Sequence, residues 1–210
     1  VGSRGMVWLE PLIEVEDASG QRIAYGAVTA DDVPGMVQAG LFDAAPHRLR
    51  LGRVEDMPWF AQQERLTFAR VGVIDPVSVD DYVAHGGFAG LKRAFGLSGA
   101  EIVDEVLESG LRGRGGAAFP TGIKWRTVLE QHSPQKYVVC NADEGDSGTF
   151  SDRMLMEGDP LCLIEGMLIA GLAVGATRGY IYLRCEYPHA GHALREAIEA
   201  ARVRGYLGPD

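Results

Sequence analysis

Alternating apolar and polar positions predict two strands near the amino terminus. The alternation runs from Pro11 to Val15 and again over 22–28, on either side of a turn at 17–20. Thr29 has the character of a helix N-cap, and the apolar spacing after it predicts a helix that ends at Gly40. A hairpin and one helix are too little to bury their own apolar face. We therefore expect this segment to be the tail of a larger domain.

Residues 42–78 are predicted to be an irregular connector, because Pro46, Pro58 and Pro76 interrupt any regular pattern. A helix is then predicted over 79–95. The next helix begins at Ser98, whose spacing to Glu101 is that of a capping box, and continues through Leu107.

Strand and helix patterns alternate in the rest of the chain. A short helix is expected to end at Gln131, and strands are expected over 137–141 and 179–184. A helical region reaching Ala176 separates these strands, and an amphipathic helix is predicted over 190–204. This order predicts parallel strands joined by crossover helices. The expected fold class is therefore α/β, with a mainly parallel sheet flanked by helices.

Composition narrows the classes of function. The formal charge of -9 argues against a nucleic-acid partner, since a phosphate-binding surface needs a basic face. No apolar run is long enough to span a bilayer, so direct membrane insertion is not expected. The chain begins without a basic and then apolar leader, and its three cysteines are too few for a disulfide framework. A cytoplasmic location is the expectation.

The segment 109–125 contains five glycines, two arginines and one lysine. Glycines allow positive φ angles and let backbone amides approach a ligand closely. Such a loop before a helix predicts a phosphate cradle, with Arg114 and Lys124 neutralising the anion. Neither standard nucleotide fingerprint fits, and the lack of a Ser or Thr after Lys124 disfavours a nucleoside-triphosphate hydrolase. The loop predicts a phosphorylated cofactor or a nucleotide.

A second polar cluster, 141–146, follows the strand predicted over 137–141. Ligands of parallel sheets bind beyond the carboxyl ends of the strands. Asn141 and Asp143 suit the hydroxyl groups of a sugar or polyol, and Glu144 and Asp146 could reach a ribose or a reacting centre. An acidic turn and a Mg²⁺ site are the alternatives. Because the glycine-rich segment lies close by in sequence, a shared cofactor pocket is the favoured interpretation.

A resident metal is not predicted. Cys185, His189 and His192 have metal-like spacing, but no fourth ligand lies near them in sequence. No C-x-x-C occurs, so a four-cysteine iron–sulfur cluster is not expected within these residues. Two interpretations of Phe119 are open: it is a packing residue under the loop, or it is an exposed ring on which a base stacks.

Four segments, 109–125, 137–153, 156–166 and 180–188, together resemble the flavoprotein subunit of NADH dehydrogenases. That family includes the 51 kDa-type FMN subunit of respiratory complex I and the diaphorase subunits of NAD-reducing hydrogenases and NAD-dependent formate dehydrogenases. The resemblance runs from about Arg65 to Asp210. It implies an FMN- and NADH-binding α/β domain at 79–210, expected to be incomplete at its carboxyl end, after the connector 42–78.

The first part of the chain, 1–41, resembles the carboxy-terminal part of a thioredoxin-like domain. Cluster-bearing versions have cysteines near the positions of Ser3 and Val7, and this chain has none, so no [2Fe–2S] cluster is expected there. Fusion of such a domain ahead of the flavin domain is typical of formate dehydrogenase β subunits and of some hydrogenase diaphorases. Residues 145–151 also look more like that branch than like complex I.

The resemblance implies a role for each matching residue. Gly113, Arg114, Gly115, Gly116 and Ala117 would surround FMN. Lys124 would hold the flavin, Asn141 and Asp143 the ribityl chain, Phe119 the adenine of NADH, and Glu144 and Asp146 the nicotinamide end. No side chain is implied as an acid or base, because hydride passes directly between the cofactors.

The resemblance also implies partners. Electrons would pass between FMN and iron–sulfur clusters of a larger complex, with a [4Fe–4S] cluster expected only beyond residue 210. The expected partners are an iron–sulfur and molybdenum or tungsten catalytic subunit and a small thioredoxin-like cluster subunit. The alternatives are the flavin subunit of an NAD-reducing hydrogenase or of NADH:quinone oxidoreductase, or a truncated docking module without catalysis.

Overall fold

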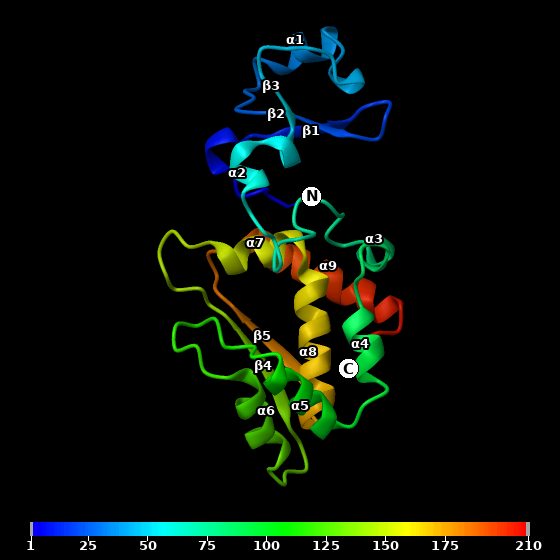
Figure 1. The fold of residues 1–210 in the computed structure, drawn as a ribbon, viewed down its shortest axis with the longest axis vertical. Coiled ribbons are helices and arrows are strands. Elements are labelled where there is room, and N and C mark those ends of the chain that lie inside the picture. The colour runs from blue at the N-terminus through cyan, green and yellow to red at the C-terminus, as the bar shows by residue number, and fades with distance from the viewer. Residues whose placement is uncertain (1, 209–210) are drawn as a thin grey trace. The chain divides into compact units, whose positions relative to one another are not determined.

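The structure, a computed structural model, describes residues 2–208, which divide into two compact units (Figure 1). One unit is Ser3–Ala69, and the other begins at Arg70 and includes Gly2. The proposed division into a thioredoxin-like part, a connector and a flavin domain stays a prediction.

An antiparallel sheet of three strands forms the first unit, in the order β1 (Ile13–Glu16), β2 (Arg22–Tyr25) and β3 (Arg50–Arg53). The predicted hairpin is therefore confirmed. The prediction of an irregular stretch after Gly40 missed β3, because this strand is short, mostly exposed and carries no apolar alternation. The helical segments of the unit are the 3-10 turns Val7–Leu9, Leu41–Asp43 and Val54–Asp56 and the helices α1 (Val33–Gln38) and α2 (Pro58–Ala61).

The second unit contains two parallel strands and seven α-helices among its described residues. Strand β4 (Tyr137–Ala142) pairs in parallel with β5 (Arg178–Leu183), so that Val139 lies opposite Tyr180. The predicted α/β class and parallel pairing are confirmed. The helices are α3 (Val79–Ala84), α4 (Ala89–Ala94), α5 (Gly99–Glu108), α6 (Thr121–Leu129), α7 (Ser151–Gly158), α8 (Pro160–Val174) and α9 (Pro188–Val203).

The single helix predicted over 79–95 is wrong, because α3 and α4 are separated by a tight turn. Gly86 has φ +82°, and the ring of Tyr82 occupies the space where Gly87 would carry a Cβ. The buried carboxylate of Glu165 accepts the Tyr82 hydroxyl at 2.5 Å and the amides of Phe88 and Leu91 at 2.8 and 2.9 Å. Glu165 thus caps the start of α4 and stabilises the break.

The helical region between the strands is also broken, at Asp159 between α7 and α8. Asp159 is fully buried and its carboxylate lies 2.8 Å from the guanidinium of Arg70. Burial raises the pKa of Asp159 to about 6, although Arg70 opposes the shift. Pro160 then begins α8, where a proline is tolerated because its missing N–H is not needed.

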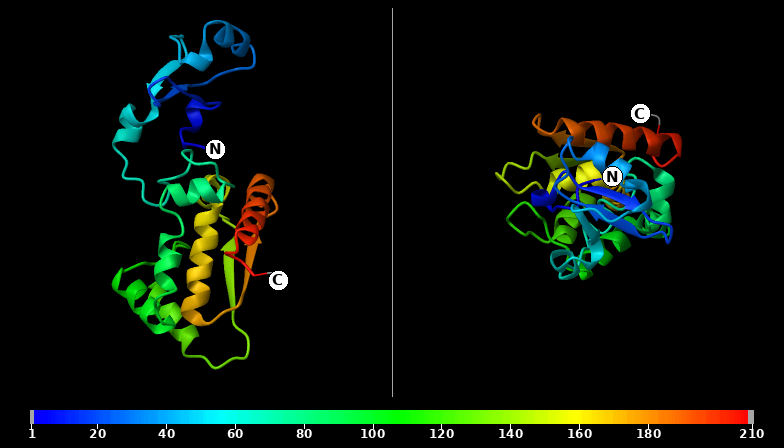
Figure 2. Two further views of the ribbon diagram at one scale, coloured as in Figure 1. Left: turned by 90° about the vertical axis from the view of Figure 1, so that its right-hand side faces the viewer. Right: turned by 90° about the horizontal axis from the view of Figure 1, so that it is seen from above.

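One face of the β4–β5 sheet is covered by helices, and the other is open. Cys140, Ala142, Ile181 and Leu183 form a hydrophobic cluster with residues of α7, α8 and α9. The views in Figures 1 and 2 show α8 and α9 alongside the two strands. On the open face, the exposed apolar and aromatic side chains are Tyr137, Val139, Tyr180 and Tyr182.

Among the described residues, no helix has both the length and the apolar character that crossing a membrane requires. The most apolar helix, α8, is instead packed against α4, α5 and α6 as well as against the sheet.

Helices α5 and α6 approach closely at Gly122. A Cβ at Gly122 would lie only 2.7 Å from the Cα of Leu107, a distance that requires the backbone to move. The absence of a side chain at Gly122 therefore permits this close approach of the two helices that flank the glycine-rich segment.

We expect Gly122→Ala to lower the free energy of unfolding by about 2 kcal/mol, because the added methyl group overpacks this contact. Chemical denaturation of both proteins measures the difference. Gly115→Ala is the matched control, since a Cβ at Gly115 meets no atom within 4 Å. Equal stability of the Gly122 variant and the control would contradict the role of this contact.

Candidate functional site

The glycine-rich segment forms a loop between α5 and α6 that is closed at its base. Gly113 N–H donates to the carbonyl of Phe119 at 2.9 Å, and Thr121 N–H donates to Leu111 at 2.9 Å. The side chain of Arg112 adds a bond to the carbonyl of Ala118 at 3.1 Å. These contacts hold residues 113–119, hereafter the glycine loop, as a projecting segment. Helix α6 begins at Thr121, so the segment expected to be loop up to Trp125 already contains its first turn.

The tip of the glycine loop is open. Gly115 and Gly116 are exposed, and a Cβ at either would meet no atom within 4 Å. Gly116 has φ +96° and Ala118 has φ +49°, so the chain turns through the left-handed region twice. Ala117 lies between them and is exposed as well. The backbone at the tip can therefore be approached closely by a ligand.

The cations expected to bind an anion are available. Arg114 and Lys124 are exposed, and neither forms an ion pair with the described residues. Lys124 lies in the first turn of α6, where backbone N–H groups lack intrahelical partners and favour an anion. Phe119 is 49% exposed, so it is not a core residue beneath the loop. Its stacking on adenine stays a prediction.

A second loop, 143–150, follows β4 and is hereafter the acidic loop. Asn141, the last exposed residue of β4, accepts the amide of Asp143 through its Oδ1 at 3.1 Å. Asp143 and Asp146 are exposed and form no ion pair with the described residues. The amide of Asn141 and the carboxylate of Asp143 can therefore accept bonds from sugar or polyol hydroxyls.

Glu144 differs from the other acids because its carboxylate is already bound. It accepts the amides of Asp152 and Arg153 at 2.8 and 3.1 Å, and the hydroxyls of Ser151 and Tyr187 at 3.2 and 2.9 Å. Partial burial disfavours the charged form, but these donors outweigh it and hold the pKa of Glu144 below its usual value. In this conformation Glu144 caps the amino end of α7. Its predicted place at the nicotinamide end stays a prediction.

A cavity of about 350 Å³ lies beside the acidic loop, at the carboxyl ends of the strands. Several of its residues, which belong to the start of α7 or follow β5, have no role predicted from the sequence. Three of them, Arg184, Glu186 and Tyr187, follow the end of β5 as the acidic loop follows β4, and this position is the signal that could have found them. The lining residues are Gly145, Asp146, Ser147, Gly148, Phe150, Arg153, Arg184, Glu186 and Tyr187.

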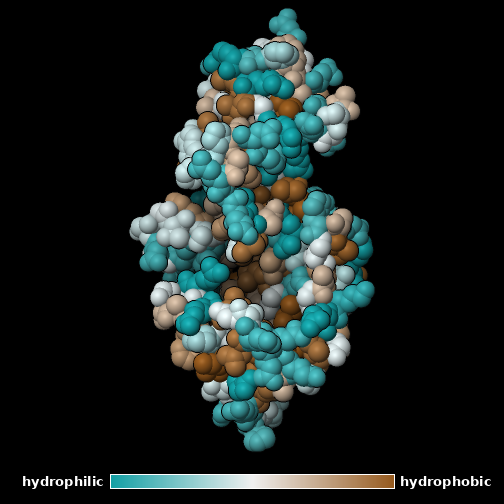
Figure 3. Space-filling view, viewed as in Figure 1, coloured by the Kyte–Doolittle hydropathy of each residue, from teal (hydrophilic) through white to brown (hydrophobic). Residues whose placement is uncertain are grey.

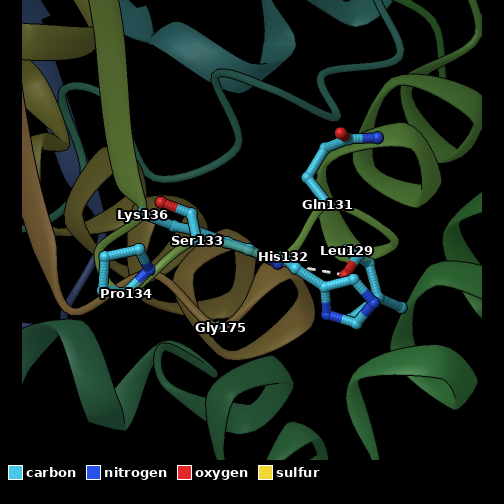
Figure 4. Close-up of a pocket in the computed structure, with 7 residues that line it drawn as sticks. All are labelled: Leu129, Gln131, His132, Ser133, Pro134, Lys136 and Gly175. Carbon is cyan, nitrogen blue, oxygen red and sulfur yellow. Dashed lines mark hydrogen bonds between the residues drawn. The ribbon is translucent and has the colours of Figure 1, made fainter.

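A larger hollow of about 610 Å³ lies at the opposite ends of the same strands (Figure 4). It is bordered by 131–134, Lys136 and Gly175, and Lys136 Nζ donates to the Leu129 carbonyl at 3.0 Å. We place the candidate site at the carboxyl ends, because ligands of open parallel sheets bind there and the exposed acids of the acidic loop follow β4 there.

The described residues contain no cluster of three or more His, Cys, Asp or Glu side chains that could hold a metal ion. Cys185 is exposed after β5, and His192 on α9 lies 3.1 Å from Glu196 instead. The metal-like spacing of Cys185, His189 and His192 therefore does not become a coordination site.

The glycine and acidic loops project from the same side of the second unit, as the front view and the view from above both show (Figures 1 and 2). The space-filling view shows this unit hollowed near its centre, with hydrophobic residues on the floor (Figure 3). No hydrogen bond or ion pair joins the two loops within the described chain. The arrangement offers cations to a phosphate at one loop and acceptors to hydroxyl groups at the other.

Comparison with known proteins gives a consistent result. Residues 106–207 match the family model of the Nuo51 FMN-binding domain. The chain is 53% identical over 147 residues to the NADP-reducing hydrogenase subunit HndC of Solidesulfovibrio fructosivorans, covering 70% of this chain and 30% of that protein. It is 49% identical over 135 residues to an NADH-quinone oxidoreductase subunit of Escherichia coli, covering 63% of this chain and 30% of the relative.

Comparison with solved structures also finds a protein that uses NAD⁺. A crystal structure of an NAD⁺-reducing [NiFe]-hydrogenase in the air-oxidized state matches with a TM-score of 0.53 and 27% identity, covering 86% of this chain and 30% of that chain. The chain thus spans about 30% of the length of the relatives that it matches.

We expect Glu144→Gln to lower the free energy of unfolding at pH 7 by about 1–2 kcal/mol, because the ionised cap of α7 is lost. The pKa of Glu144 is lower in the folded chain than the ordinary 4.5. The carboxylate therefore stabilises the fold above about pH 4.5, and this contribution disappears as the pH falls through the lower folded value.

Denaturation of both proteins from pH 7 to pH 3 measures this effect, and the difference should shrink towards the acid end. Glu130→Gln, at an exposed position after α6, is the control. A difference that is constant with pH would contradict the role of the charge.

Proposed function

We propose that the chain binds FMN and exchanges hydride between FMN and NAD(H), because residues 106–207 match the family model of the Nuo51 FMN-binding domain. The match confirms the expected family, and with it FMN and NAD(H) as the cofactors of that family. What the whole protein does is our proposal, since the chain spans only about 30% of each relative.

The observation that carries the proposal is the pairing of an open, cationic glycine loop with an acidic loop on one side of the unit. The residues present fit FMN. The space above Gly115 and Gly116 is free of other atoms, so a phosphate could approach the backbone there. Arg114 and Lys124, which lack acidic partners in the described chain, would neutralise its charge.

The acidic loop would bind the part of FMN that carries hydroxyl groups, the ribityl chain. Asn141 and Asp143 are exposed acceptors suited to the ribityl chain, and Asp146 borders the cavity after β5. Phe119, exposed on the glycine loop, would stack on the adenine of NADH. When bound, FMN supplies the two-electron chemistry, and the side chains of this chain hold and orient the reactants.

The complex in which the chain works is a finer proposal. The relatives are named as subunits of a hydrogenase or of NADH-quinone oxidoreductase, and these two assignments are supported about equally. A formate dehydrogenase assignment has in its favour the sequence of the acidic loop and the resemblance of residues 1–41 to a fused thioredoxin-like domain. The molybdenum or tungsten partner depends on this assignment. Partner subunits that carry iron–sulfur clusters are proposed in every case.

We expect Gly115→Val to abolish FMN binding while leaving the fold intact. The side chain would fill the gap between backbone and phosphate, yet its Cβ would meet no atom of the described chain within 4 Å. The measurements are flavin absorbance per chain and the temperature of unfolding. Gly166→Val, which also places its Cβ in open space on α8, is the control that should keep its flavin.

Stoichiometric flavin in the Gly115 variant would overturn the assignment of the cradle. A correctly folded unmodified protein that stays colourless in excess FMN would favour the docking module instead.

A further inference from the structure

Tyr187 connects the end of β5 to the acidic loop after β4. Only 6% of Tyr187 is exposed, and its hydroxyl donates to Oε2 of Glu144 at 2.9 Å. Tyr187 immediately precedes α9, and its backbone N–H donates to the carbonyl of Arg184 at 3.3 Å. Tyr187 is thereby held in the segment that follows β5, while its hydroxyl binds the acidic loop that follows β4.

Arg184 also binds Glu144, but at the backbone carbonyl of Glu144 rather than at its carboxylate. Its Nη1 donates to the carbonyl oxygen of Glu144 at 2.5 Å, and its guanidinium lies 5.0 Å from the centre of the Tyr187 ring. Glu186 lies 3.2 Å from the guanidinium and orients it further. Glu144 is therefore fixed at both its carboxylate and its backbone by residues that follow β5.

The backbone of Glu144 needs this support. Its φ of +32° is in the left-handed region, which a residue with a side chain rarely adopts. Such strain persists only where the surroundings hold it, and it gathers at functional sites. Asp143 precedes Glu144, and Gly145 and Asp146 follow it, so the conformation of Glu144 decides the direction in which the acidic loop leaves the sheet.

We propose that Tyr187, assisted by Arg184, is a positioning residue for the dinucleotide: it acts through Glu144 to set the conformation of the acidic loop. This inference rests on the proposed function. The geometry separates the roles of the two loops, because Tyr187 contacts the acidic loop and not the phosphate cradle at Gly115.

The test is Tyr187→Phe in the intact protein with its natural partners. NADH oxidation is measured with ferricyanide as acceptor, and flavin content is measured by absorbance. We expect the KM for NADH to rise about tenfold, with flavin content retained and kcat changed much less, because one bond that holds the loop is lost.

Tyr82→Phe is the matched control. Its hydroxyl also donates to a buried carboxylate, that of Glu165, at 2.5 Å, but it supports the turn before α4 rather than the acidic loop. This variant should lose stability without any change in the KM for NADH. Equal KM values for both variants would overturn the proposal, since Tyr187 would then be merely structural.

A double-mutant cycle tests the route through Glu144. If Tyr187 acts through this carboxylate, adding Tyr187→Phe to Glu144→Gln should change the KM for NADH less than twofold further. Fully additive effects would contradict the route. A parent protein without flavin would refute the proposed function itself. A parent that contains flavin but has the same KM for NADH as its Tyr187→Phe variant would refute only this inference.

Discussion

The packing of β4 and β5 against α8 and α9 is the constraint on which the candidate site depends. Two parallel strands are not stable alone, because they bury too little apolar surface. Here Cys140, Ala142, Ile181 and Leu183 join the hydrophobic cluster of the flanking helices. Because the strands run in parallel, the segments that follow them emerge at one edge. The acidic loop and the turn from Arg184 to Tyr187 are therefore neighbours.

The acidic loop and the glycine loop are held by different kinds of contact. The glycine loop is closed by backbone hydrogen bonds, by the bond from the Arg112 side chain to the Ala118 carbonyl, and by the approach of α5 and α6 at Gly122. At its tip, a Cβ at Gly115 or Gly116 would meet no atom within 4 Å. The acidic loop is fixed instead through one residue, Glu144, whose carboxylate and backbone carbonyl both accept hydrogen bonds. One loop is thus open to a ligand through its backbone, and the other presents side chains from a fixed support.

Much of the second unit could be predicted from sequence, because its elements have strong local signals. The capping box of Ser98 and Glu101 is present, and the strand at 137–141 and its parallel partner lie where apolar patterns placed them. The tertiary contacts could not be predicted. The break at Gly86 depends on Glu165, which lies far along the chain, and the short strand β3 forms only by pairing with β2. The same holds within the site, since nothing local to Glu144 indicates that Tyr187 and the start of α7 hold it.

The open face of the β4–β5 sheet has a consequence for the behaviour of the isolated chain in solution. Tyr137, Val139, Tyr180 and Tyr182 form an uncovered apolar stripe, and β4 and β5 are both edge strands within the described residues. Uncovered apolar surface and free strand edges favour contact between molecules. At high concentration, self-association should therefore begin at this stripe, in spite of the strongly negative net charge.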